Sequence, residues 1–305
     1  PYLDPDLPHA WPRQSKLTKA VQRVCADDLE AQLLRIDAAA ASWFASCRLH
    51  GSGAWLHSSP KIALFRVSSQ LYRVMLAMRL MVKIPSTDLV ARCVCGSTGW
   101  QLRYGVHWFS SCRCATLKTA RHNAVVKVMA EMSTKIRMQV REGESACWIR
   151  GRPDLRPFDL LVRPYDDLSS PWQGYDITIA DPTRLGLVPS GSRYFKSGKA
   201  SSRLVSKKKY HFRRLVQQHG LTHPAEFAAL GFEVTGGLGS HASDWLKEVC
   251  SQAQELGAGA PERNWTASNF SAYYTQLLSF TTVKLTALSV LNGIRRSIAE
   301  TLAQA

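Results

Sequence analysis

The sequence lacks an unbroken apolar run of the roughly 18 or more residues that a membrane-spanning helix needs, and this predicts that nothing in it crosses a membrane. Its first residues also lack the charged-then-apolar pattern of a secretory signal. The chain starts at Pro1 and has no initiator Met, which predicts that it is a piece of a longer protein. Internal repeats and low-complexity tracts are absent. What remains is a chain of 305 residues, 45% hydrophobic, which is enough for a real core in one large domain or two ordinary ones.

Acidic residues are scarce, and one long stretch has none. The formal net charge is +16 and the isoelectric point is about 9.7. No Asp or Glu occurs from Pro182 to Ala225, whereas ten Lys or Arg residues lie between Arg184 and Arg214. These ten are Arg184, Arg193, Lys196, Lys199, Arg203, Lys207, Lys208, Lys209, Arg213 and Arg214. The alternative is a basic protein without an anionic partner. However, positive charges in a stretch without acids repel one another unless an anion neutralises them. The stretch therefore favours nucleic acid as the partner.

The eight cysteines argue for a reducing compartment. Four of them fall between Cys93 and Cys114, and the other four are scattered through apolar or amphipathic sequence. The scattered four are Cys25, Cys47, Cys147 and Cys250. Isolated thiols of this kind are typical of reduced proteins, and a disulfide framework is not expected in a chain of this length without a secretion signal.

Apolar periodicity predicts helices and strands in an α/β arrangement. We expect helices over residues 15–48, from 68 to just before Pro85, over 119–139, from about 200 to 219, and over 281–305. Strands are expected at 160–162, 177–179 and 227–237, the last ending in a glycine turn. The alternation of strands and helices between 150 and 250 indicates an α/β unit.

The clustered cysteines predict a structural zinc site. The best set of ligands is Cys93, Cys95, His107 and Cys112, and either Cys114 or His122 could replace one of them. Tetrahedral Zn²⁺ selects thiolate and imidazole, and a short segment with little core of its own needs such a crosslink. Free thiols in a reduced loop are the alternative. A catalytic zinc is not expected, because residues 96–130 contain no acid that could serve as a base.

Asp159 and Asp176 each stand directly before a short apolar strand. Two carboxylates on neighbouring strands can hold Mg²⁺ or Mn²⁺ while a nucleic-acid phosphate completes its coordination. Because side chains alternate along a strand, Asp176 shares a face with Thr178 while the isoleucines pack on the other. The alternative is that both aspartates only end strands or begin turns. The basic stretch that follows them favours the metal site.

A positive group near such a metal would orient the attacking water or stabilise the charge that develops. On the helix from about 200 to 219, Lys208 and Lys209 flank the apolar stripe and Lys207 points away, although both flanking lysines could instead reach solvent. Glu233 is a further candidate, either as a metal ligand or as an ordinary acid at the end of a strand.

Several short motifs in a fixed order resemble a known family over roughly residues 50 to 296. They are SGAWL from Ser52, LYRVMLAMRLMV from Leu71, CVCG from Cys93, His107 with Cys112, RHN from Arg121, RPFDLLV from Arg156, YDITIADP from Tyr175, KKKY from Lys207, FEVTGGLGSHA from Phe232 and VKLTALSVLNGIRR from Val283. Together they resemble the restriction-like endonuclease region at the C-terminus of site-specific non-LTR retrotransposon proteins, a relative of PD-(D/E)XK nucleases. No polymerase segment is present.

The resemblance implies a mixed sheet flanked by helices, preceded by a Cys-Cys-His-Cys zinc module and by N-terminal helices. It implies metal-dependent nicking of target DNA, with Asp159 as the first acid, Asp176 as the second and Lys209 as the shifted lysine of the K-x-x-K-Y helix. Three departures stand out. Thr178 stands where the family's second motif usually has a lysine. Ser206 stands at the position of the first lysine of K-x-x-K-Y, so Lys207 or Lys208 could take over its role. Asp154 is a second candidate, beside Asp159, for the first acid.

We therefore expect a helical region over 1–90, a zinc module with a linking helix over 91–147, an endonuclease core over 148–245 and a helical tail over 246–305. The expected activity is Mg²⁺- or Mn²⁺-dependent nicking of DNA in the nucleus, with the nick priming reverse transcription. The expected partners are the DNA target, the element's RNA and the polymerase portion of a longer protein. The alternatives are a catalytically silent nucleic-acid-binding module that keeps the zinc, and a structural zinc protein with no nucleic-acid role.

Overall fold

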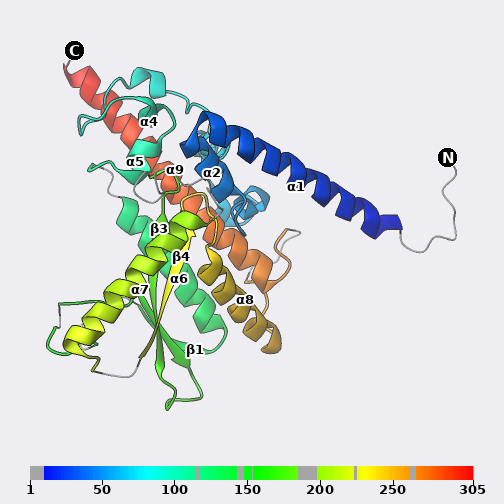
Figure 1. Ribbon diagram of the computed structural model, residues 1–305, viewed down its shortest axis with the longest axis vertical. Helices are drawn as coiled ribbons and strands as arrows, with labels where there is room; N and C mark the ends of the chain where they lie inside the picture. The colour runs from blue at the N-terminus through cyan, green and yellow to red at the C-terminus, as the bar shows by residue number, and fades with distance from the viewer. Residues whose placement is uncertain are drawn as a thin grey trace.

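The computed structural model describes residues 10–114, 117–142, 148–152, 154–184, 198–222, 225–261 and 266–304. The long helices and the sheet dominate this part of the chain (Figure 1). The elements are α1 (Ala10–Ile36), α2 (Ala38–Cys47), η1 (Ala54–His57), η2 (Ala63–Phe65), α3 (Ser69–Arg79), η3 (Thr87–Leu89), α4 (Trp100–Arg103), α5 (Val106–Ser110), α6 (Leu117–Lys135), β1 (Met138–Glu142), β2 (Leu160–Pro164), β3 (Trp172–Ala180), α7 (Lys199–His219), β4 (Ala225–Glu233), α8 (Ser240–Glu255) and α9 (Phe270–Gln304).

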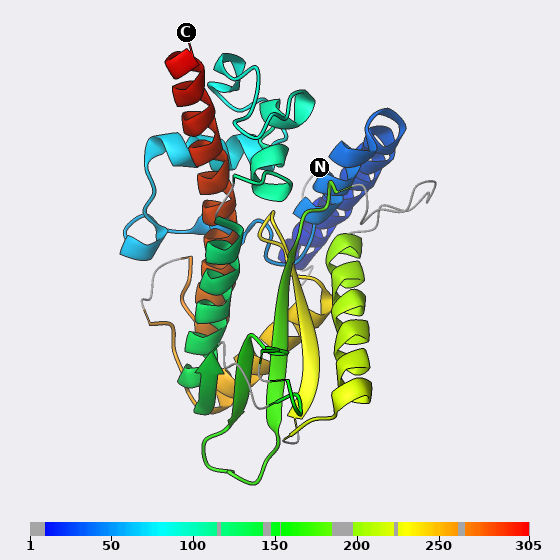
Figure 2. The same cartoon turned by 90° about the vertical axis from the view of Figure 1, so that its left-hand side faces the viewer.

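The four strands form one mixed sheet in the order β1-β2-β3-β4. The β1–β2 and β2–β3 pairs are antiparallel, and the β3–β4 pair is parallel because α7 carries the chain across between them. Helix α7 covers one face of the sheet, while α6 and α9 lie on the opposite side (Figure 2). The expected α/β class with a mixed sheet and flanking helices is confirmed, and the Cys-rich segment precedes the sheet as predicted.

Side chains on the two faces of the sheet enter two apolar clusters. Tyr175 and Ile177 point into the main core, which also contains buried residues of α3, α6, α8 and α9. On the α7 side, a smaller cluster joins Phe158 to Trp148, Leu161 and Trp172, with Phe212 and Phe227 packed against it. Gly174 is required there, because a Cβ at that position would lie 2.1 Å from the Phe158 ring. The alternation of β3 therefore leaves Asp176 on the α7 face, as the sequence indicated.

Helix α9 is the spine of the main core. By length and composition it could cross a membrane, the one such helix among the described residues, although polar residues interrupt its apolar sequence. However, 67% of its most apolar stretch is buried inside the protein, against α3, α5, α6 and α8. Burial of this extent is typical of a helix in the core of a protein. Buried residues from all four predicted regions share the main core, so packing runs across the predicted boundaries.

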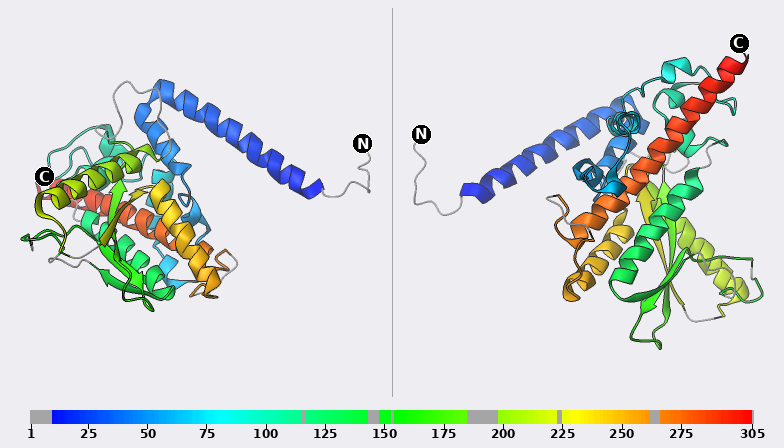
Figure 3. Two further views of the ribbon diagram at one scale, coloured as in Figure 1. Left: turned by 60° about the horizontal axis from the view of Figure 1, so that its bottom comes forward. Right: turned by 180° about the vertical axis from the view of Figure 1, so that it is seen from behind.

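The N-terminal helix ends earlier than predicted, and the reason is a cap. The continuous helix expected over 15–48 is broken at Asp37, whose carboxylate accepts hydrogen bonds from the N–H groups of Ala39 and Ala40 at 2.8 and 3.2 Å. These bonds start a new helix, α2, in a different direction. Helix α1 consequently projects away from the rest of the protein (Figure 3).

Replacing Gly293 with Ala is expected to destabilise the fold by about 1–3 kcal/mol, although Ala favours helices over Gly by about 1 kcal/mol. A Cβ at this position in α9 would lie 2.1 Å from the ring of Trp108, which is completely buried. Chemical denaturation would measure the change. Gly53→Ala is the control, because its new Cβ would meet only Arg79 at an ordinary 3.7 Å. Equal stability of the two variants would contradict the prediction.

Candidate metal sites and basic helix

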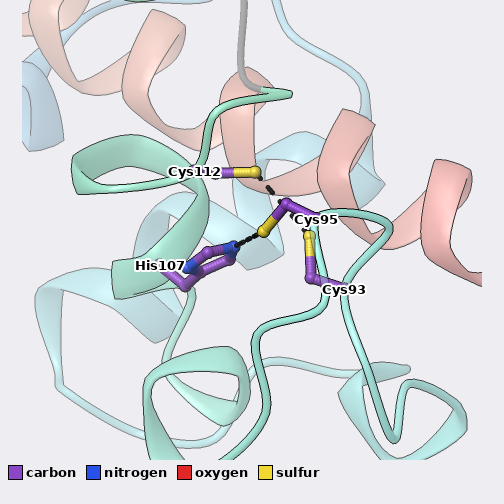
Figure 4. A group of neighbouring side chains, drawn as sticks. All are labelled: Cys93, Cys95, His107 and Cys112. Carbon is purple, nitrogen blue, oxygen red and sulfur yellow. Dashed lines mark hydrogen bonds between the residues drawn. The ribbon is translucent and has the colours of Figure 1, made fainter.

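The Cys-rich segment brings four ligand atoms together (Figure 4). Cys93 and Cys95 lie in a turn closed by a hydrogen bond from the Cys93 N–H to the Ser97 carbonyl, 2.8 Å, while His107 lies on α5 and Cys112 just after it. The three sulfur atoms and a His107 ring nitrogen all lie within 4.8 Å of one another. This is the predicted quartet. Cys114 and His122, the alternative ligands, are not members of it.

The geometry of this quartet fits zinc. A tetrahedral site with Zn–S bonds of about 2.3 Å places its sulfur atoms about 3.8 Å apart. The Sγ atoms of Cys93 and Cys112 are 3.7 Å apart, and the Cys95 Sγ lies 3.1 Å from His107 Nε2. Burial and the neighbouring thiols raise the pKa of Cys112 to about 12. Burial also acts to raise the pKa of Cys95, but hydrogen bonds with Ser97 and the neighbouring thiols lower it to about 7. The group can therefore bind zinc.

The second candidate site lies on the part of β3 that extends beyond β2. Strand β2 begins at Leu160, opposite Tyr175, so no described strand pairs with this side of β3 after that point. The Asp159 carboxylate accepts a hydrogen bond from the Ile177 N–H at 2.7 Å. His122, on α6, places its Nε2 3.1 Å from Asp159 Oδ2 and 3.2 Å from the Ile177 carbonyl oxygen. A carboxylate and an imidazole thus occupy the free backbone edge.

Asp176 joins this site from the α7 face. Lys208 donates a hydrogen bond to Asp176 Oδ1 at 2.8 Å, and the aspartate side chain is only 15% exposed. Burial raises the pKa of Asp176 to about 6, Lys208 opposes that shift, and the charge of Asp159 and a contact with its carboxyl group add to it. Burial also acts to raise the pKa of Asp159, but His122, the Ile177 N–H and Lys208 together hold it below its usual value. The two carboxyl groups therefore lie near each other, with Asp159 bonded to the N–H of the residue that follows Asp176.

Two other predicted catalytic side chains lie elsewhere. Lys209, preferred from the sequence, places its Nζ 2.9 Å from His241 Nε2 on α8, so Lys208 is the lysine beside the carboxylates. Glu233 is buried and accepts hydrogen bonds from the Ser201 hydroxyl and N–H at 3.1 and 3.3 Å. Glu233 pairs with Ala180 across the β3–β4 ladder. Ala180 is four residues along β3 from Asp176, and four residues of a strand span about 13 Å.

The competing first acid, Asp154, is exposed and forms an ion pair with Arg152, whose guanidinium nitrogens lie 2.9 and 2.7 Å from its two oxygens. No contact links it to Asp176 or Lys208 among the hydrogen bonds of the described residues. The structure therefore associates Asp159, and not Asp154, with Asp176.

The solvent face of α7 carries four of the predicted nucleic-acid-binding residues. Arg203, Lys207, Arg213 and Arg214 are exposed there, and the helix contains no acidic residue. Lys199 is half-buried at its start, and Arg184 is exposed shortly after β3. Arg193 and Lys196 lie outside the described residues. The same helix thus presents a cationic surface to solvent and Lys208 to the carboxylates.

Sequence reasoning missed His122 at this site, having considered it only as an alternative zinc ligand. Its contact with Asp159 spans 37 residues, and nothing in the local pattern around RHN points to a carboxylate that far along the chain. The chain matches no protein-family model and no curated protein. The assignment of function therefore depends on the geometry of these two sites and on the basic helix.

Proposed function

We propose that the protein is a Mg²⁺- or Mn²⁺-dependent DNA endonuclease with a restriction-endonuclease-like core. The observation that carries this proposal is the placement of the two acids: Asp159 accepts from the N–H of Ile177, the residue next to Asp176, and Lys208 of the cationic helix α7 donates to Asp176. Carboxylate oxygens are the ligands that Mg²⁺ and Mn²⁺ prefer. Burial is the main cause of the raised pKa of Asp176, and the nearby charge of Asp159 adds to it.

Each group of residues has its own role in this proposal. Asp159 and Asp176 would hold the ion, which, when bound, makes water a better nucleophile and offsets negative charge at phosphorus. Lys208 is placed to orient that water or to stabilise the developing charge. Arg203, Lys207, Arg213 and Arg214 would bind the phosphate backbone, so affinity for DNA should fall steeply as salt rises. Zinc in the Cys-Cys-His-Cys group would have a structural role.

The resemblance to retrotransposon endonucleases supports a more specific proposal. The zinc-type group before the sheet and the mixed sheet flanked by helices agree with what that family implies. We infer that the nick made by this protein serves target-primed reverse transcription in the nucleus. The DNA target, the element's RNA and the polymerase portion of a longer protein would then be its partners.

Supercoiled plasmid provides the direct test of nuclease activity. The zinc-loaded protein should convert supercoiled to open-circular plasmid in Mg²⁺ or Mn²⁺, and chelation of the added ion with EDTA should stop it. Salt-sensitive DNA binding with no open-circular product in either ion would instead indicate a catalytically silent nucleic-acid-binding module. The absence of both activities would leave a structural zinc protein.

Replacing each of the two neighbouring lysines in turn with Ala should distinguish their roles. Lys208→Ala is expected to slow nicking by about 10²–10³-fold, because it removes the ammonium group that donates to the Asp176 carboxylate. Lys209→Ala is the matched control and should change the rate less than tenfold, since its ammonium contacts His241. Single-turnover nicking rates would measure both. A larger loss in the Lys209 variant would restore that residue as the catalytic lysine.

Glu233→Gln is expected to leave the rate of nicking within about threefold of wild type. The amide keeps the shape of the side chain and can still accept from Ser201, and the position lies about 13 Å along the sheet from Asp176. The same plasmid assay measures this, with circular dichroism to confirm folding. A folded Glu233→Gln protein with no activity would show that this carboxylate belongs to the reaction.

A further inference from the structure

The start of helix α7 is held by a carboxylate from the neighbouring strand β4. The helix has no side-chain cap of its own, since its N-cap residue is Gly198. The N–H and the hydroxyl group of Ser201, in the first turn, instead donate to Glu233 Oε1 at 3.3 and 3.1 Å, and both residues are buried. A carboxylate at this place accepts an otherwise unpaired N–H and interacts favourably with the positive end of the helix dipole. Glu233 therefore caps α7 from outside the helix.

Two glycines let the first turns of α7 lie directly on β4 and on the turn that follows it. A Cβ at Gly231 would lie 2.9 Å from the Ser201 Cβ and 3.0 Å from the Val205 Cγ2. A Cβ at Gly239 would lie 2.8 Å from the Ser201 hydroxyl oxygen. The packing is therefore too close for the start of α7 to slide or rotate while its bonds to Glu233 remain.

The face of α7 that meets Glu233 is also the face that carries Lys208. Ser201, Val205 and Lys208 are spaced i, i+4 and i+7, which places them on one side of a helix. Seven residues of helix span about 10 Å, and at that distance from Ser201 the ammonium group of Lys208 donates to Asp176 Oδ1 at 2.8 Å. Each residue adds about 100° of rotation, so a shift of one position would turn Lys208 away from Asp176.

We propose that Glu233 is a positioning residue, which holds the start of α7 so that Lys208 meets Asp176. The stack of Phe212 on Phe227 fixes the same helix farther along, so loss of the cap should displace Lys208 without unfolding α7. Glu233→Gln keeps an oxygen acceptor, which agrees with the small effect on nicking expected for it. The inference rests on the proposed function only where nicking is measured, because the bond between Lys208 and Asp176 can be observed without it.

NMR of isotope-labelled lysine side chains tests the position of Lys208 directly. The ammonium signal of Lys208, identified by its loss in Lys208→Ala, should be protected from exchange with water in the wild-type protein. Glu233→Ala should lose this protected signal, because the start of the helix is no longer held, and Glu233→Gln should keep it. Circular dichroism would confirm that each variant is folded.

Nicking rates give a second readout, which a general loss of stability would not reproduce. Glu233→Ala should slow single-turnover nicking by about tenfold or more, because a small misplacement of a functional group is costly. The double variant Glu233→Ala/Lys208→Ala should be no slower than Lys208→Ala alone, because a displaced lysine and an absent one leave the same site. Two independent defects would instead multiply their losses.

Two further variants make the result decisive. Glu226→Ala removes an exposed acid of the same strand and should change neither the Lys208 signal nor the nicking rate. Ser201→Ala removes the hydroxyl partner of Glu233 and should speed exchange of the Lys208 ammonium by about twofold or more, so it carries the test if Glu233→Ala does not fold. An unchanged Lys208 signal in these cap variants, or losses that multiply, would overturn the inference while the proposed nuclease stands. If the signals change as expected but the wild-type protein does not nick plasmid, the proposed function fails and the positioning of Lys208 remains.

Discussion

Asp176→Asn is expected to abolish Mg²⁺-dependent nicking, with a fall of about 10³-fold or more, while DNA binding stays near the wild-type level. Removal of a single well-placed electrostatic group typically costs about 10²–10³-fold in rate, and this change also weakens the hold on the ion. The asparagine keeps the size of the side chain and an oxygen that can accept from Lys208. The cationic side chains of α7 are unaltered, so gel-shift affinity should change little.

The two candidate first acids supply the controls for this experiment. Asp159→Asn should be as inactive as Asp176→Asn, because its carboxylate shares the same site. Asp154→Asn should keep wild-type activity, because Asp154 is exposed and pairs with Arg152. An active Asp176→Asn protein, or loss of activity only in the Asp154 variant, would disprove the assignment of the catalytic carboxylates.

Cys112→Ser is expected to release zinc and to lower the melting temperature by about 10 °C or more. Structural zinc contributes about 10–16 kcal/mol of binding free energy in small zinc domains, and that energy is available only to the folded form. Cys93 and Cys112 are both part of the main core, so loss of the ion also loosens packing against α9. A shift of this size corresponds to several kcal/mol for a chain of this length.

Cys114→Ser is the matched control, since Cys114 is close in sequence but is not one of the four converging ligands. It should retain one zinc per chain by elemental analysis and melt within about 2 °C of wild type. Zinc retained by the Cys112 variant, or lost by the Cys114 variant, would mean that a different set of thiols binds the metal.

The sequence predicted the strands that contain a buried apolar run but not the half-exposed strand β1. Leu160–Leu161–Val162 is buried, Ile177–Thr178–Ile179 is largely buried, and both carry a strong apolar signal. Strand β1, Met138–Glu142, is half-exposed and follows a helix directly, so its few apolar residues looked like the end of that helix. The break at Asp37 was also missed, because helical periodicity continues on both sides of the cap.

The candidate sites were predictable where ligands are close in sequence or begin a strand. The zinc-type quartet lies within twenty residues, and both aspartates precede apolar runs. The choice between Lys208 and Lys209 was not predictable, because both flank the apolar stripe of α7. That choice depends on the rotation of α7 about its axis, which is set by contacts such as Phe212 stacking on Phe227 with ring centroids 4.0 Å apart.

The length difference between β2 and β3 has a consequence for solubility. A strand that outruns its neighbour offers unpaired N–H and C=O groups, and such edges invite pairing with another chain and aggregation. At Ile177 both backbone groups are already engaged, the N–H by Asp159 and the carbonyl by His122. The side chains of Asp159 and His122 therefore occupy the backbone groups of Ile177 that could otherwise pair with a strand of another chain. Variants that make them apolar should be checked for oligomers before any loss of activity is interpreted.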